Sequence, residues 1–79
     1  MKVTVRVFAA LREQLGTSSL EVEVGDGSTV ADVVDRLADR HAGLRDHPFA
    51  TALNQRYADA SAAVGDGDEV ALIPPVSGG

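Results

Sequence analysis

The sequence contains no cysteine, and this absence removes several kinds of chemistry at once. A chain without cysteine has no disulfide framework, no thiolate zinc site and no cysteine nucleophile. Histidine is scarce as well, because only His41 and His47 are present and neither stands in a cluster of acids. Two isolated histidines do not make a metal site, so no metal is predicted.

Long apolar runs are also lacking. No stretch is long enough to span a bilayer, and the first residues lack the apolar segment of a signal peptide. We therefore expect a cytoplasmic protein that does not use a membrane.

Basic side chains are few and scattered. Seven Lys and Arg against twelve Asp and Glu give a net charge of −5. Nucleic acids are bound by clustered Lys and Arg, so a nucleic-acid partner is not predicted. The acidic surface either favours basic partner proteins or serves only solubility.

The 79 residues are sufficient for one small domain. Residues 2–8 and 19–24 alternate between apolar and polar side chains, which predicts two strands with one buried face each. Residues 9–16 between them are rich in helix formers and end in a glycine, which predicts a helix of about two turns. This connection is too short for a parallel crossover, so the two strands are expected to be antiparallel.

The main helix is predicted from Val30, where apolar residues begin to recur at helical spacing. Thr29 and Asp32 resemble a capping box at its start, and Gly43 is expected to end it. Residues 44–50 are predicted to be irregular, 51–58 to form two short strands around a tight turn, and 59–68 to form a loop.

Residues 69–73 are almost wholly apolar, which predicts a last strand in the middle of the sheet, buried on both faces. One main helix on one face of a mixed sheet, with the last strand parallel to the first, is the β-grasp arrangement, an α+β fold. Residues 1–73 are expected to form this domain, and residues 74–79 a flexible C-terminal tail.

No self-contained active site is visible in the sequence. The serines show no Ser-His-Asp pattern, and Gly25-Asp26-Gly27 lacks the lysine and the spacing of a phosphate loop. The run 65–68 does not match a calcium loop and is typical of a turn. Whether the chain counts as an enzyme stays open, and catalysis is expected to belong to partners.

The tail Pro74-Pro75-Val76-Ser77-Gly78-Gly79 is the unusual segment. The prolines favour an extended path, and the two glycines can pass through a slot as narrow as a backbone. We interpret the Gly79 carboxylate as a chemical handle that other enzymes act on. The alternative is a frayed terminus, which is common at chain ends.

Three blocks of the sequence carry a resemblance: residues 8–16 (FAALREQLG), 53–55 (LNQ) and 66–79 (DGDEVALIPPVSGG). They are similar to the MoaD/ThiS group of ubiquitin-like sulfur carriers, above all to those that act as the small subunit of molybdopterin synthase. The resemblance covers the whole chain in element order, and the C-terminal block is its specific part.

The resemblance implies a mechanism and a set of partners. An ATP-dependent activating enzyme would adenylate Gly79, and a sulfur donor would convert it to a thiocarboxylate. The tail, Pro74 to Gly78, would thread into the large subunit of molybdopterin synthase and deliver the sulfur for molybdopterin. Phe8, Leu11, Arg12 and Ile73 would contact the partner, and alternation along the strands places Phe8 and Ile73 on the face away from the main helix. No cofactor would be bound by the chain itself, because ATP is used by the activating enzyme.

Three functional hypotheses stay open at this point. The first is the sulfur carrier of molybdenum cofactor biosynthesis, or a carrier for another pathway such as tRNA thiolation or thiazole synthesis. The second is a ubiquitin-like modifier whose Gly79 is joined to lysines of target proteins. The third is a passive β-grasp interaction domain.

Overall fold

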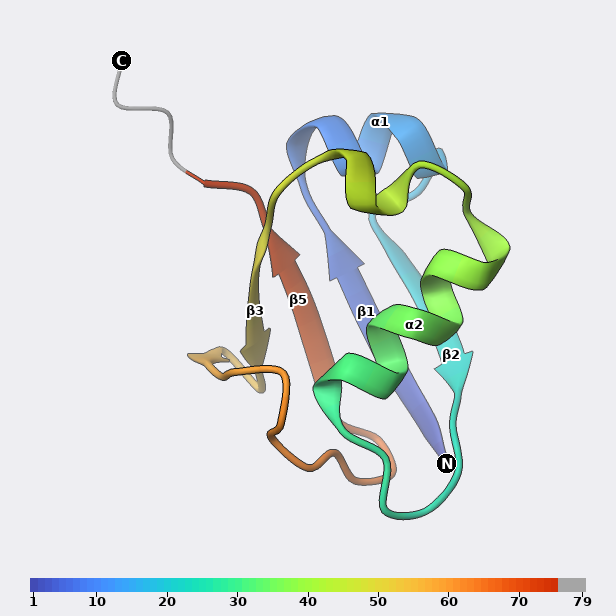
Figure 1. Ribbon diagram of the computed structural model, residues 1–79, viewed down its shortest axis with the longest axis vertical. Coiled ribbons are helices and arrows are strands. Elements are labelled where there is room, and N and C mark those ends of the chain that lie inside the picture. The colour runs from blue at the N-terminus through green and yellow to red at the C-terminus, as the bar shows by residue number, and fades with distance from the viewer. Residues whose placement is uncertain (76–79) are drawn as a thin grey trace.

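The computed structural model describes residues 1–75 and contains one five-stranded sheet and two α-helices. The strands lie in the order β2-β1-β5-β3-β4, with β5 in the centre (Figure 1). The elements in chain order are β1 (Lys2–Val7), α1 (Ala9–Leu15), β2 (Ser19–Glu23), α2 (Val30–Arg40), a 3-10 helix (Leu44–Asp46), β3 (Ala50–Leu53), β4 (Arg56–Tyr57) and β5 (Glu69–Ile73).

The sheet topology confirms the predicted β-grasp arrangement. β1 and β2 are antiparallel, whereas β1 and β5 are parallel, with Thr4 opposite Glu69 and Val7 opposite Leu72. β3 is antiparallel to β5, and β4 closes the far edge. The parallel pair places the first and last strands of the chain side by side. The C-terminal ends of β1 and β5 therefore lie at the same end of the sheet.

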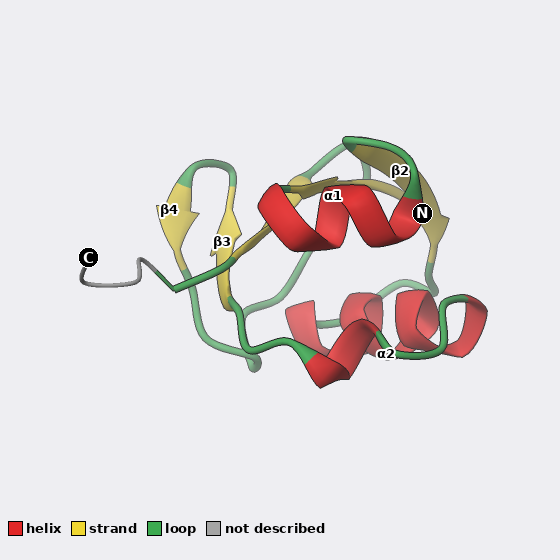
Figure 2. Cartoon of the chain, turned by 90° about the horizontal axis from the view of Figure 1, so that it is seen from above, coloured by secondary structure: helices red, strands yellow, loops and turns green. Residues whose placement is uncertain are grey.

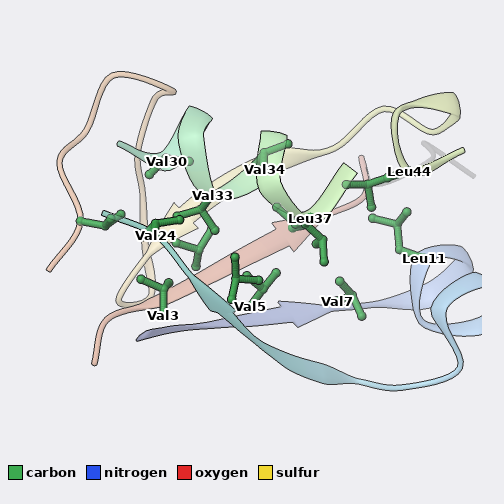
Figure 3. Packing of buried hydrophobic residues seen from close by; sticks show 14 residues of the cluster. Val3, Val5, Val7, Leu11, Val24, Val30, Val33, Val34, Leu37 and Leu44 are labelled. Carbon is green, nitrogen blue, oxygen red and sulfur yellow. The ribbon is translucent and has the colours of Figure 1, made fainter. Parts of the chain in front are cut away.

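The core lies between the sheet and α2 (Figure 3). The predicted inward face of β1 is buried, because Val3, Val5 and Val7 are at most 1% exposed. The apolar stripe of α2 meets this face with four buried side chains, those of Val30, Val33, Val34 and Leu37. Burying one such side chain contributes about 1.5–3 kcal/mol, so the matching of the two periodic patterns holds the layers together.

The start of α2 has the predicted capping box. The Asp32 N–H donates to Thr29 Oγ1 at 3.4 Å, and the Thr29 N–H donates to Asp32 Oδ2 at 2.9 Å. These bonds satisfy two backbone donors at the helix N-terminus.

The end of α2 differs from the prediction. The helix ends at Arg40 with His41 in an extended conformation, earlier than Gly43. Gly43 instead adopts φ 89° and begins the 3-10 helix within the segment predicted to be irregular. This left-handed turn places Leu44, at 1% exposure, in the core, so burial of Leu44 shapes the segment.

The turn between β3 and β4 is fastened to the start of β5. The Asn54 side chain donates to Asp68 Oδ1 at 3.1 Å and accepts from the Glu69 N–H at 3.0 Å. Asp68 Oδ2 accepts from the Gly65 N–H at 2.7 Å. These two hydrogen bonds hold the pKa of the Asp68 carboxyl below its usual value. The bond from the Gly65 N–H has the larger effect, and the bond from the Asn54 side chain has the smaller one.

The central position predicted for β5 is confirmed, and its burial on both faces is confirmed only in part. Val70 and Leu72 are fully buried toward α2, whereas on the other side Ala71 is buried and Glu69 and Ile73 are only half-buried. α2 lies on one side of the sheet (Figure 2), and α1 lies beyond the end of β1. We call the uncovered side the open face. Within residues 1–75, no helix is long and apolar enough to cross a membrane.

Candidate functional site

The tail begins where β5 leaves the sheet. Alternation along β5 directs Ala71 and Ile73 to the open face, because Val70 and Leu72 point into the core. Pro74 follows half-buried and Pro75 exposed. The strand therefore delivers the chain directly into the Pro-Pro segment without an intervening loop.

The open face carries a shallow depression of about 390 Å³, which we call the open-face hollow. It is lined by Arg6, Phe8, Ala52, Gln55, Tyr57, Glu69, Ala71 and Ile73. The strand register explains it: Ala71 lies between Arg6 of β1 and Ala52 of β3, and Ala52 lies opposite Tyr57 of β4. Two alanines form the floor, and longer side chains on both sides form the walls.

Arg6 supplies the charge on one wall of the hollow. Its guanidinium lies 3.8 Å from Glu69 Oε2 and 5.9 Å from the centre of the Phe8 ring. Both partners keep the arginine side chain over the sheet, although it is about half exposed. An exposed ion pair of this kind contributes little to stability.

A second depression of about 330 Å³ adjoins the hollow at the end of β5, and we call it the tail-root groove. It is lined by Pro48, Phe49, Ala50, Tyr57, Ile73, Pro74 and Pro75. Tyr57 and Ile73 line both depressions. With a side chain 78% exposed, Tyr57 is a large aromatic that stands beside the root of the tail. The two depressions form one mostly apolar surface around the place where the tail leaves the domain.

Phe8 and Ile73, two of the predicted contact residues, are brought together on this surface. Both line the open-face hollow, and Phe8 is 40% exposed although it is aromatic. Their predicted position on the face away from the main helix is confirmed. The role predicted for them, contact with a partner, stays a prediction.

Leu11 is not available to a partner, which corrects its inclusion in the predicted interface. It is 1% exposed and belongs to the core. Leu11 is the buried residue of α1, and burial of its apolar side chain in the core holds the short helix against the domain. The short helix thus lies against the domain with Leu11 inward. Arg12 is exposed on α1 but does not line either depression.

The remaining predicted residues of the tail, Val76, Ser77, Gly78 and Gly79, lie outside the described residues. Other residues of this surface were missed by the sequence analysis, namely Arg6, Phe49, Ala52 and Tyr57. For Tyr57 a signal exists, since period-two alternation in the 50–57 hairpin places it beside Ala52 on the outward face. Residues 1–75 contain no group of three or more His, Asp or Glu that could hold a metal ion.

Comparison with known proteins gives consistent matches over the full length. The molybdopterin synthase sulfur carrier subunit of Mycobacterium tuberculosis is 46% identical, with 100% of this chain and 99% of that protein covered. The crystal structure of SAMP1 from Haloferax volcanii superposes with a TM-score of 0.90 at 32% identity, covering both chains completely. A protein–protein complex of subunits 1 and 2 of the molybdopterin-converting factor from Helicobacter pylori contains a chain that matches with a TM-score of 0.73 at 26% identity, again with full coverage.

The model of the ThiS family matches residues 5–79, which include the second half of β1, the other four strands, the tail root and the terminal glycines. The match agrees with the β-grasp topology and with the resemblance of the C-terminal block. This chain therefore belongs to the ThiS family.

Proposed function

We propose that this chain is a sulfur carrier protein that serves molybdopterin synthesis as the small subunit of a molybdopterin synthase. One observation carries the proposal: the central strand β5 leads directly into Pro74-Pro75 beside an open apolar surface. The 46% identity to a molybdopterin synthase sulfur carrier subunit over the full length supports the same function. The hollow and the groove would hold the partner, and the tail would carry the reactive atom.

The chemistry requires a partner that activates the Gly79 carboxylate, because a carboxylate is a poor electrophile. A carboxylate oxygen attacks the α-phosphorus of ATP on an activating enzyme, and pyrophosphate leaves. Hydrosulfide delivered by a sulfur donor then attacks the carbonyl carbon, so that a C–S bond forms, the C–O bond to AMP breaks, AMP leaves, and the S–H proton passes to solvent. The product is a terminal thiocarboxylate, whose sulfur is a competent nucleophile.

In the proposed transfer step the large subunit binds the open face while the tail enters its active site. Gly78 and Gly79 have no Cβ and can pass a narrow channel, and Pro74-Pro75 lose little entropy on docking. The sulfur then attacks a carbon of the cyclic pterin precursor, from which an oxygen substituent leaves. Water cleaves the resulting thioester, so that the sulfur stays on the pterin and the Gly79 carboxylate is regenerated. The chain itself contributes binding and positioning, and catalysis belongs to the large subunit. We place these steps in the cytoplasm, where the activating enzyme has ATP.

A protein-modifier function is the second candidate, because this chain is similar to SAMP1 of Haloferax volcanii, which is named small archaeal modifier protein 1. Both functions begin with the same acyl adenylate and differ in the nucleophile, which is a sulfur donor in one and a lysine amine in the other. The identity to the sulfur carrier subunit is higher than that to SAMP1, so we rank the carrier first.

A reconstituted transfer reaction tests the proposal. The chain is converted to its thiocarboxylate, mixed with the large subunit and the cyclic pterin precursor, and the dithiolene product is measured. We expect product with the wild-type chain and with Asp39→Asn, an exposed change on α2 that lies in neither depression. Deletion of Gly79 should abolish product. In cells, loss of the gene should abolish molybdoenzyme activity. Persistence of that activity together with loss of high-mass conjugates would favour the modifier instead.

A further inference from the structure

The chain carries very few amines that an activated carboxyl could acylate. Lys2 is its single lysine, the other six basic residues are arginines, and cysteine is absent. Arginine stays protonated and does not act as an amine nucleophile under ordinary conditions. The amines of the chain are therefore the Lys2 Nζ and the α-amino group of Met1.

Both amines lie at the opposite end of the sheet from the root of the tail. β1 and β5 are parallel, with Thr4 level with Glu69 and Val7 level with Leu72. Lys2 therefore lies beyond the start of β5, whereas the tail leaves after its end at Ile73. Figure 1 shows the N-terminus at the lower end of the sheet and the tip of β5 at the upper end.

The tail is short compared with the distance from its root at Ile73 to Lys2 of the same molecule. Ile73 is level with Phe8 by extension of the register, so Lys2 lies six residues away along the strand, roughly 20 Å at ~3.3 Å per residue. Residues 74–79 span at most about 20 Å when fully extended. Ile73 and Pro74 each precede a proline, which disfavours the α-helical conformation at these residues and favours an extended path. The chain would have to reverse after Pro75, and the residues left beyond that point span at most about 14 Å.

The two amines differ in their availability to other molecules. The Met1 ammonium donates to the Val24 carbonyl oxygen at 2.8 Å in a partly buried position. Lys2 is exposed, and its cross-strand neighbour is Glu23. Lys2 is therefore the amine of the chain that a second molecule can reach.

We propose that the fold keeps an activated Gly79 from acylating an amine of its own chain, and that Lys2 is the single amine through which a second copy of this chain can be attached as an amide. The inference rests on the proposed function, in which Gly79 becomes an acyl adenylate. In the linking step the unprotonated Lys2 Nζ of one copy attacks the Gly79 carbonyl carbon of another. The C–N bond forms, the bond to AMP breaks, AMP takes the electron pair, and the amine proton passes to solvent. Within one copy no amine reaches the Gly79 carbonyl carbon, so the activated carboxyl stays available to a nucleophile of a partner.

The test uses the full chain with a C-terminal alkyl thioester at Gly79, which replaces the adenylate without any activating enzyme. Intact mass separates the hydrolysed acid, a cyclic amide and a covalent dimer, and peptide mapping locates the new bond. In dilute solution the wild type should give the acid with no cyclic product. In concentrated solution a dimer joined through Lys2 should form, and Lys2→Arg should lose it.

Ala50→Lys is the matched variant, because it places an amine in the tail-root groove beside Ile73. We expect cyclic product in dilute solution, roughly tenfold or more above the wild type, since a nearby amine reacts at a high effective concentration. Circular dichroism confirms that the variant is folded. Cyclic product from the wild type at the level of Ala50→Lys would overturn the proposal, as would no cyclic product from Ala50→Lys. A dimer that persists in Lys2→Arg would overturn the assignment of Lys2.

This outcome is independent of the sulfur-carrier function. The thioester bypasses adenylation, so failure of the activating enzyme to modify Gly79 would refute the proposed function and leave these products unchanged. Conversely, a cyclic product from the wild-type thioester would show that the Gly79 carboxyl can reach an amine of its own chain. That result would refute the further inference, and it would not affect the formation of the thiocarboxylate by the activating enzyme.

Discussion

Ala52 and Ala71 lie opposite each other on the antiparallel strands β3 and β5 and form the floor of the open-face hollow. Both are buried, at 3% and 8% exposure, although no helix covers this face. Their small side chains leave room that Arg6 and Tyr57 border on either side. The depth of the hollow therefore depends on two residues that contribute almost no surface of their own.

Filling the hollow should impair partner binding without unfolding the domain. Ala71→Gln places a longer polar side chain on the floor, pointing away from the core. We expect affinity for the large subunit to fall roughly tenfold or more, because centrally placed contacts dominate interface energetics. The free energy of unfolding should change by no more than about 1 kcal/mol. Titration calorimetry and urea denaturation measure the two quantities.

The control for this change is Ala10→Gln, the same substitution at an exposed position on α1. It should leave the affinity unchanged. Equal affinity of Ala71→Gln and wild type would contradict a docking role for the hollow.

Tyr57 should be important for binding and unimportant for stability. Its side chain is 78% exposed, so Tyr57→Ala removes little packing and should change the free energy of unfolding by about 0.5 kcal/mol or less. Exposed aromatics beside a functional surface are typical anchors, and the loss in binding should be about 1–2 kcal/mol. Surface plasmon resonance against the large subunit measures it, with Arg56→Ala as the neighbouring control. Stronger destabilisation than loss of binding would place Tyr57 in the fold instead.

Leu11 should be important for the stability of the domain, whereas its neighbour Arg12 should not. Leu11→Ala removes a buried side chain from the core and should destabilise the domain by about 2–5 kcal/mol. Arg12→Ala, at an exposed position of the same helix, should stay within about 0.5 kcal/mol of the wild type. Urea denaturation of both variants measures the difference. If Leu11→Ala were as stable as Arg12→Ala, the inward position of Leu11 would be wrong.

The bonds to Asp68 should make stability depend on acid pH. The Gly65 N–H and then the Asn54 amide lower the pKa of Asp68 in the folded state below the usual 3.8. The unfolded state therefore binds the proton more readily, so the bonds stabilise the fold above the unfolded pKa. This contribution is lost as the pH falls through the folded pKa.

Asp68→Asn should flatten the decline of unfolding free energy with falling pH, measured by urea denaturation at a series of pH values from neutral to below the usual carboxyl pKa. Asp39→Asn is the control, since the structure of residues 1–75 gives the Asp39 side chain no hydrogen bond or ion pair. A decline for Asp68→Asn as steep as that of the wild type would show that these bonds do not couple to folding.

The sequence predicts most of the fold because the spacing of apolar residues determines which face of each element is buried. Val3, Val5 and Val7 repeat at period two, and the α2 stripe repeats at helical period, so one sheet face and one helix face match. The almost wholly apolar β5 has no such alternation. Its central position was therefore predictable, but the open second face was not.

The short segments were predicted less well for a different reason. In α1 only seven residues are helical, so periodicity says little about its orientation, although Leu11 and Leu15 at i and i+4 do indicate an inward stripe. The 3-10 helix forms because Leu44 enters the core, a long-range contact that local sequence does not reveal. For the site, Phe8 and Ile73 followed from strand parity, whereas Tyr57 depends on the register of β3 and β4.

Deletion of Gly79 should leave the melting temperature unchanged, because a terminal glycine has no side chain to pack. The same variant then serves as the control for the central claim that the Gly79 carboxyl is the group that carries sulfur. The direct measurement is the intact mass of the chain after incubation with ATP, a sulfur donor and the activating enzyme, followed by mass mapping of the C-terminal peptide. We expect the mass to rise by the replacement of one oxygen by sulfur, located on Gly79 and absent in the deletion variant. An unchanged mass, under conditions in which the enzyme activates another carrier, would contradict the account.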